Sequence, residues 1–138
     1  MKRAVIYLFI LVALVVPVSC KKGGCNVIQY VNFSTTVSLV EYNALLLPRQ
    51  PVIVPQGGVS GLVVMQLSDN QYVAYDRTST VEPERGCAVE LADGGPLAID
   101  PCSGAKYILI NGSPAEIAEC PLRPYRVYRR GEVLFISN

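Results

Sequence analysis

Residues 62–76 read LVVMQLSDNQYVAYD, and this stretch decides the fold class. Two runs of aliphatic and aromatic residues, 62–67 and 72–75, flank Ser68-Asp69-Asn70. Such side chains suit the pleated surface of a strand, whereas Ser, Asp and Asn favour a tight turn. The pattern therefore predicts a β-hairpin at this position.

The same kind of short run recurs on both sides of the hairpin. Further strands are expected at residues 27–33, 52–54, 88–91, 97–99, 107–110, 125–128 and 133–136. Gly, Pro, Asn and Asp separate them, and Asn111-Gly112 is the strongest turn signal. Only residues 37–47 and 114–119 have room for a short helical turn, because no segment keeps helical periodicity for longer. The sequence predicts an all-β domain with nine or ten strands.

The amino-acid composition excludes several classes of function. The chain has 138 residues, of which 51% are hydrophobic and 17% charged, so it is long enough for one domain and too apolar to be disordered. It contains no His, which excludes Ser-His and Cys-His nucleophile pairs and every His-containing metal site. The formal net charge of +1 gives no reason to expect a polyanionic partner. An enzyme is therefore not expected.

The N-terminus has the pattern of a targeting segment. Met1-Lys2-Arg3 precedes an unbroken apolar run over 4–18, and Ser19-Cys20 follows. This run is shorter than the roughly 20 residues that a membrane-spanning helix needs, and it suits a signal peptide. The segment resembles a bacterial lipoprotein signal, which implies that Cys20 is lipidated; an ordinary secretory peptide and an uncleaved anchor are the alternatives.

The expected organisation is a signal peptide at 1–19, a lipidated tether at 20–24 and a β domain at 25–138. Cleavage would leave 119 of the 138 residues with a net charge of −1. The predicted location is the bacterial cell envelope, outside the cytoplasm and facing the periplasm. The expected partners are membrane lipid, bound through Cys20, and an envelope protein that the sequence does not identify. Disulfides persist in such a compartment, and Cys25, Cys87, Cys102 and Cys120 permit three pairings.

The segment from Tyr75 to the C-terminus resembles a Rieske iron–sulfur domain. The Gly-rich stretch that leads into it, residues 55–78, is also similar to such domains and reads PQGGVSGLVVMQLSDNQYVAYDRT. The matching pieces are Asp76-Arg77, a first box at Ser79, a second box DPCSG at 100–104, the turn at Asn111-Gly112 and PLRPY at 121–125. The resemblance implies an antiparallel β-sheet domain with a larger base and a smaller loop-tip subdomain, the tip spanning 78–114.

The resemblance also identifies the positions of the cluster ligands. A Rieske [2Fe–2S] cluster is held by two Cys thiolates on one iron and two His imidazoles on the other. Carried over residue by residue, the two Cys positions are Ser79 and Asp100, and the two His positions are Val81 and Ser103. All four ligands of the family are replaced. We therefore expect neither a cluster nor any other metal, although intact family members carry [2Fe–2S].

Two disulfides are expected. In the family a non-ligand Cys in each box ties the two cluster loops together, which implies a bridge between Cys87 and Cys102, with a redox switch as the alternative role. The first and last strands of Rieske-like folds lie close together in the base, so Cys25 and Cys120 are expected to form a second bridge. Two buried, inert thiols are the alternative for this second pair.

Two other groups of residues have a functional and a structural interpretation, and we favour the structural one for both. The first group has four acidic residues: Asp76, Glu82, Glu84 and Asp100. Their carboxylates either supply oxygen ligands for a cation or are solvated charges on loops. In the structural interpretation, Asp76 and Arg77 form a pair. The second group either forms a surface strip that binds nucleic acid or belongs to a half-exposed strand: Arg123, Tyr125, Arg126, Tyr128, Arg129 and Arg130. No nucleic-acid partner is expected.

Three functions remain for this sequence. The favoured one is a non-catalytic, cluster-free Rieske-like lipoprotein that acts as a binding or structural module. The others are a Rieske electron carrier, which the replaced ligands contradict, and a cation or small-ligand site on the former cluster loops. Val81 favours a closed apolar tip over a polar pocket, and hence the first function.

Overall fold

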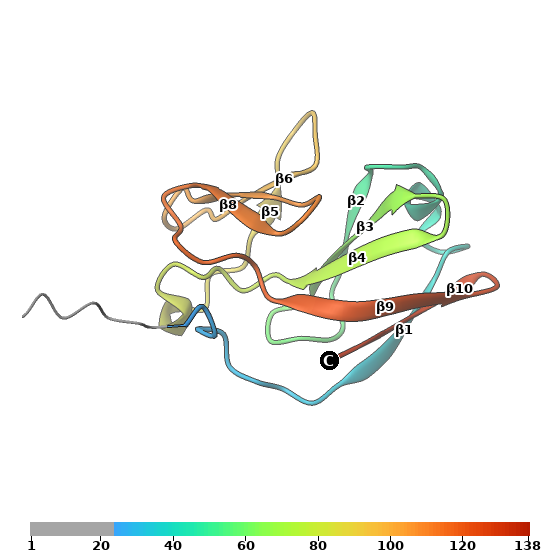
Figure 1. The fold of residues 1–138 in the computed structure, drawn as a ribbon, viewed down its shortest axis with the longest axis horizontal. Coiled ribbons are helices and arrows are strands. Elements are labelled where there is room, and N and C mark those ends of the chain that lie inside the picture. The colour runs from blue at the N-terminus through green and yellow to red at the C-terminus, as the bar shows by residue number, and fades with distance from the viewer. Residues whose placement is uncertain (1–23) are drawn as a thin grey trace, which may run out of the picture.

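The computed structural model describes residues 24–138 (Figure 1). The predicted signal peptide at 1–19 and Cys20 lie outside the described residues. The elements are β1 (Ser34–Ser38), η1 (Asn43–Leu46), β2 (Pro51–Val54), β3 (Leu62–Ser68), β4 (Gln71–Asp76), η2 (Pro83–Arg85), β5 (Glu90–Leu91), β6 (Leu97–Ile99), β7 (Lys106–Ile108), β8 (Ser113–Glu116), β9 (Pro124–Arg130) and β10 (Val133–Ser137), where η denotes a 3-10 helix. No helix within residues 24–138 is long and apolar enough to cross a membrane.

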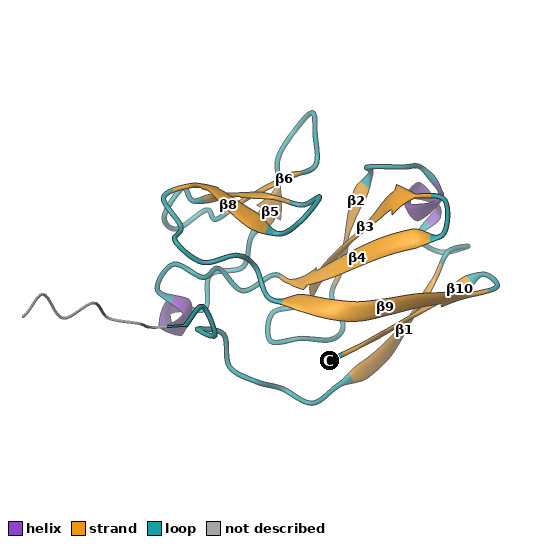
Figure 2. Cartoon of the chain, viewed as in Figure 1, coloured by secondary structure: helices purple, strands orange, loops and turns teal. Residues whose placement is uncertain are grey.

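The strands form two antiparallel sheets, which Figure 2 shows side by side. The base sheet has six strands in the order β1-β10-β9-β4-β3-β2, and the tip sheet has four in the order β5-β6-β7-β8. The first and last strands pair with each other, Ser34 opposite Ser137. The tip sheet is therefore an insertion between β4 and β9, which are themselves neighbours in the base.

The hairpin quoted above is present as β3 and β4, with Asn70 in the left-handed region at φ 61°. Leu62 and Val64 point into the base core, whereas Val63 and Met65 point into a second core shared with the tip sheet. Alternate side chains of a strand face opposite sides of the sheet. The unbroken apolar run at 62–65 thus belongs to a strand with a hydrophobic core on each face.

The tip sheet is fixed to the base through this second core. Tyr107, Leu109 and Leu122 are fully or almost fully buried there, together with Val63 and Met65 from β3. Gly112 supports the join, because its φ is 74° and a Cβ atom would lie 2.6 Å from the Tyr75 ring. Of the predicted Asn111-Gly112 pair, only the glycine adopts a positive φ.

The strand predicted at 27–33 is wrong, since β1 begins only at Ser34. Side chains from distant parts of the chain bind the backbone of this segment instead of a neighbouring strand. Arg123 donates to the carbonyl oxygens of Ile28 and Gln29, and the Asn138 amide donates to that of Val31.

Residues 114–119 had room for a helical turn but contain none, because residues 114–116 belong to β8 at the edge of the tip sheet. An edge strand tolerates Pro114, which has no N–H to donate. The turn predicted at 37–47 is partly present, as the last residues of β1 followed by η1.

Candidate functional site

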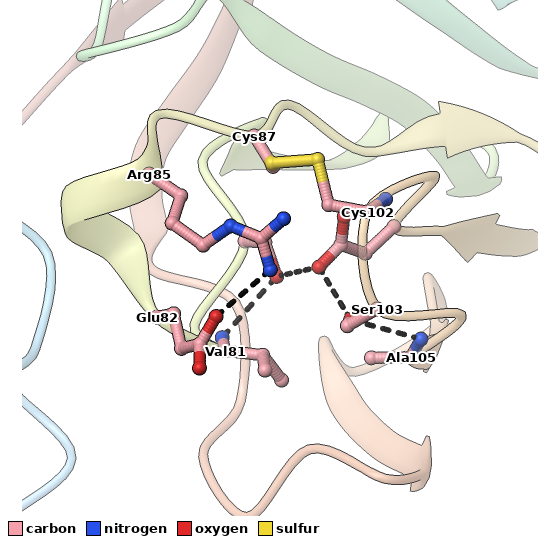
Figure 3. A network of polar contacts seen from close by, with 9 residues as sticks. Val81, Glu82, Arg85, Cys87, Cys102, Ser103 and Ala105 are labelled. Atoms are coloured by element: carbon pink, nitrogen blue, oxygen red, sulfur yellow. Dashed lines mark hydrogen bonds and ion pairs between the residues drawn. A yellow bond between two sulfur atoms is a disulfide. The ribbon is translucent and has the colours of Figure 1, made fainter.

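The four residues that the Rieske resemblance assigns to ligand positions come from two loops, and the structure brings these loops together. The Ser79 hydroxyl donates to Asp100 Oδ2 at 2.7 Å, and the Ser103 hydroxyl donates to the same oxygen at 2.5 Å. The backbone N–H of Val81 donates to Ser79 Oγ at 3.2 Å. Figure 3 shows this network, with the disulfide beside it. We call Ser79, Val81, Asp100 and Ser103, joined in this way, the serine–aspartate network.

Backbone hydrogen bonds hold each loop in the shape that the network needs. In the first loop, Ser79 N–H donates to the Cys87 carbonyl at 2.8 Å, so the chain returns on itself around η2. In the second, Asp100 N–H donates to the Ala105 carbonyl and Gly104 N–H donates to the Asp100 carbonyl, both at 2.8 Å. Gly104 has a φ of 77° in this tight turn. Backbone hydrogen bonds alone therefore fix the conformation of both loops.

Tyr107 links the network to the chain beyond the tip sheet, a role that the sequence analysis missed. Its hydroxyl lies 3.2 Å from Ser79 Oγ and 2.9 Å from Thr80 Oγ1, and it accepts from Thr80 N–H at 3.1 Å. Thr80 Oγ1 donates in turn to the Cys120 carbonyl at 2.7 Å. Both smaller hydroxyls donate elsewhere, so either of them can accept the single Tyr107 proton.

Asp100 is the centre of the network and is fully buried. Burial raises the pKa of its carboxyl, but hydrogen bonds from the Ser103 and Ser79 hydroxyls and from the backbone N–H groups of Cys102 and Ser103 outweigh this effect. The pKa of Asp100 is consequently lowered from its usual value. A carboxylate that accepts several hydrogen bonds is stable without a cation beside it.

The network does not fit an iron–sulfur cluster. Val81 has no donor atom, and serine hydroxyls that donate protons to a carboxylate are not thiolate or imidazole ligands. Two oxygen ligands of one tetrahedral metal ion, each bound at about 2.1 Å, lie about 3.4 Å apart. Ser79 Oγ and Asp100 Oδ2 are 2.7 Å apart with a proton between them. These two oxygens are hydrogen-bonded to each other and lie closer together than two ligands of one tetrahedral metal ion.

The structure contains both expected disulfides. Cys87 is bonded to Cys102 with a Cα–Cα distance of 6.3 Å, and Cys25 to Cys120 with 5.2 Å. The sulfur atoms of Cys87 and Cys102 and a carboxylate oxygen of Asp100 lie within 4.8 Å of one another. In the disulfide, however, neither sulfur is a thiolate, the form that binds metal. This group of three side chains is not a metal site while the disulfide is intact.

The four acidic residues do not meet in one site. Asp76 is fully buried and accepts from Tyr125 Oη at 2.7 Å, Val59 N–H at 2.6 Å and Thr78 N–H at 2.8 Å. Burial and the bond to Asp76 raise the pKa of Tyr125. Arg77 makes no salt bridge to Asp76 and donates instead to the Val89 carbonyl. Asp76 is therefore a structural acceptor that joins the base to the first loop.

Glu82 lies on the first loop and pairs with Arg85 at 2.9 Å. Among the described residues, the one cluster of three potential metal-ligand side chains includes Asp100 but none of Asp76, Glu82 and Glu84.

The arginine and tyrosine strip is a half-exposed strand, as favoured from the sequence. Exposure alternates along β9, with Arg126 and Tyr128 on the exposed face and Val127 and Arg129 partly buried. Tyr128 stacks on Phe135 with the ring centroids 5.0 Å apart. Arg129 donates to the Gly131 carbonyl at 2.8 Å, so this guanidinium is engaged within the domain.

The chain matches no protein-family model and no curated protein sequence. Among solved structures, it is similar to a chain of the complex of reduced oxygenase and oxidized ferredoxin in carbazole 1,9a-dioxygenase. The identity is 21%, the TM-score is 0.50, and the match covers 75% of this chain and 92% of that chain.

A second similar structure is assigned as the NADH-dependent nitrite reductase small subunit from Mycobacterium tuberculosis. Here the identity is 16%, the TM-score is 0.47, and the match covers 79% of this chain and 97% of that chain. The first likeness establishes the fold, which is all-β and Rieske-like, as the sequence predicts.

Proposed function

We propose that this chain is a cluster-free Rieske-like lipoprotein of the bacterial cell envelope that acts as a non-catalytic binding or structural module. The serine–aspartate network is the observation that carries the proposal. Ser79 and Asp100 are both fully buried, and each makes hydrogen bonds to the other loop. Hydrogen bonds and a disulfide thus join the two loops where intact family members use metal.

Electron transfer needs a redox centre, and the residues on these loops argue against an iron–sulfur centre. Binding iron would require the Ser79 and Ser103 hydroxyls to lose the protons that they donate to Asp100. A hydroxyl deprotonates far less readily than a thiol, and breaking the network would leave buried polar groups unsatisfied. A structural role for the loops accounts for all of these contacts.

The cellular location of the protein is part of the proposal. Two disulfides among Cys25, Cys87, Cys102 and Cys120 fit an oxidising compartment outside the cytoplasm. The lipoprotein-like signal before Cys20 supplies the anchor, and the lysines after it favour a domain that faces the periplasm. The partners are then membrane lipid, through Cys20, and an envelope protein recognised by the domain surface.

Chemical reconstitution tests the absence of a cluster. The full chain is expressed in bacterial cells, purified anaerobically from detergent-solubilised membranes, and incubated with ferrous iron and sulfide. A variant with a restored ligand set is treated in parallel: Ser79→Cys, Val81→His, Asp100→Cys and Ser103→His. A known Rieske protein serves as the positive control in case the variant does not fold. We expect no visible absorption from the wild-type chain, and stable [2Fe–2S] bands from it would refute the proposal.

The anchor is tested separately with Cys20→Ser. The wild-type chain should appear in the membrane fraction, with an N-terminal peptide that begins at Cys20 and carries the mass of the added lipid. The variant should lose that mass. An unmodified Cys20 in a membrane-free protein would contradict the lipoprotein assignment without affecting the result on the cluster.

A further inference from the structure

The described chain begins beside the former cluster loops. Cys25 is bonded to Cys120, and the Cys120 carbonyl accepts from Thr80 in the first loop at 2.7 Å. Figure 1 shows this start next to η2, at the end of the molecule opposite the β9–β10 turn. The segment that precedes Cys25 therefore attaches at the loop end of the domain.

The residues after Cys25 are fixed in this place. Arg123 Nη1 donates to the carbonyl oxygens of Ile28 and Gln29, both at 3.0 Å, and Ile28 is 5% exposed. The Arg123 guanidinium also lies 5.9 Å from the centre of the Tyr30 ring. With the disulfide on one side and these contacts on the other, the attachment point cannot move to another face of the domain.

Exposed apolar side chains surround this attachment point. Val27 is 39% exposed and Ile117 is 64% exposed, and both line a shallow hollow of about 300 Å³ with Val81, Thr80, Glu119 and Cys120. We call Val27, Ile117 and the partly buried Val81 the anchor-side patch. A β-branched residue rarely adopts a positive φ, yet Ile117 has a φ of 68° and remains exposed. The core of the domain does not account for this side chain, because it is not buried.

We infer that the anchor-side patch lies against the surface of the lipid bilayer. The inference rests on the proposed lipid anchor at Cys20. Five residue steps separate Cys20 from Cys25, which span at most about 18 Å when fully extended. The anchor thus holds the patch near the headgroups, where even a weak apolar contact forms at high effective concentration.

The charges beside the patch predict a shallow contact. Glu119 lines the hollow, and Glu84 lines a neighbouring hollow that also includes Val27. Both glutamates are exposed, and carboxylates remain hydrated. The apolar side chains therefore reach the headgroup boundary while the domain stays above it, and the former cluster loops face the membrane.

The two exposed leucines at η1 lie far from this contact. Leu46 and Leu47, which are 46% and 59% exposed, lie at η1, which packs against β3 near Gln66. The opposite end of β3, at Leu62, pairs with Asp76 next to the first loop. A strand of seven residues extends about 20 Å. The short tether therefore holds the loop end, and not η1, next to the anchor.

Single tryptophans test the orientation, because the chain contains no Trp and an introduced indole is the only one. Ile117→Trp reports on the patch, Leu47→Trp is the matched control at the far end, and Val27→Trp is a second reporter in case position 117 does not tolerate the larger ring. Each lipidated full chain is reconstituted into vesicles of phosphatidylethanolamine and phosphatidylglycerol, with and without brominated acyl chains. We expect brominated lipid to quench most of the fluorescence at 117 and 27 and little at 47.

Flotation of the same vesicles separates this inference from the anchor. If the protein floats but the indoles at 117 and 27 are quenched no more than the one at 47, the membrane contact is wrong and the patch is left for a protein ligand. If the wild-type chain does not float, the anchor fails and the inference fails with it. Loss of flotation in Cys20→Ser, together with strong quenching at 117 and 27 in the anchored protein, would support both.

Discussion

Asp100→Asn removes the charge at the centre of the serine–aspartate network while changing the size of the side chain very little. In the wild-type domain, Asp100 Oδ2 accepts from the Ser79 and Ser103 hydroxyls, and Oδ1 accepts from the Cys102 N–H at 2.8 Å. The asparagine oxygen can keep the backbone bond. Its NH₂ group then faces the two hydroxyls, which must turn from donors into acceptors.

The size of the effect follows from these contacts. A hydrogen bond to a charged group contributes about 1.5–3 kcal/mol to stability, against about 0.5–1.5 kcal/mol for a neutral one. Two bonds that change from the first kind to the second therefore cost about 2–3 kcal/mol of unfolding free energy. For a domain of this size, that is a decrease in Tm of about 10 °C.

Denaturant unfolding of the two proteins measures this loss, with the disulfides intact in both. Asp69→Asn is the matched control, because it removes the same charge from an exposed residue of the β3–β4 turn. We expect the control to unfold within about 0.5 kcal/mol of the wild type. Both variants keep the m-value if only the folded state has changed.

The pH dependence gives a second, independent readout. The pKa of Asp100 is lowered in the folded state, so its ionised form contributes stability above the ordinary carboxyl pKa of about 3.9. That contribution is lost as the pH falls through the lower, folded pKa. The difference between the wild type and Asp100→Asn should therefore be full near neutral pH and shrink in acid. A variant as stable as the wild type, or a difference that does not change with pH, would refute the role given to the network.

Three further variants test other contacts. Replacing both Cys87 and Cys102 with Ser opens a bridge of 15-residue separation and should lower the free energy of unfolding by about 3 kcal/mol. Amide hydrogen exchange should then rise in the tip sheet before it rises in the base sheet. Uniform exchange in the two sheets would contradict this order. Tyr125→Phe removes a bond to the buried Asp76 carboxylate and should cost about 2 kcal/mol in thermal unfolding. The raised pKa of Tyr125 also predicts that wild-type stability falls above about pH 10. This fall should be smaller in the phenylalanine variant, in which burial still raises the pKa of Tyr75. Gly58→Ala places a methyl group against the Asp76 carboxylate at a φ of 64° and should destabilise the domain by more than about 1 kcal/mol, so an unchanged Tm would contradict the close packing there.

Local pattern was sufficient for the strands that pair with near neighbours. The run at 62–67, the turn at 68–70 and the run at 72–75 became β3 and β4 because a hairpin needs only contacts between adjacent segments. The segment at 27–33 has a similar composition but no strand to pair with. Its backbone partners, Arg123 and Asn138, are about 100 residues away in sequence, and local composition carries no information about them.

The site could be located from the sequence but not described. The family resemblance placed Ser79, Asp100 and Ser103 at the former ligand positions, and the structure brings them together. That Asp100 would serve as a shared acceptor depends on side-chain positions to within an ångström. Tyr107 lies between Lys106 and Ile108 in an ordinary short strand, so nothing in this pattern indicates that its hydroxyl contacts the other loop.

The iron and acid-labile sulfide content of the protein tests the central claim most directly. The full chain is isolated anaerobically from membranes of iron-replete cells, and both elements are measured per mole of chain. The serine–aspartate network predicts that neither rises above the level found for an unrelated envelope protein isolated in the same way. Iron and sulfide each at about two per chain, the content of a [2Fe–2S] cluster, would contradict the account.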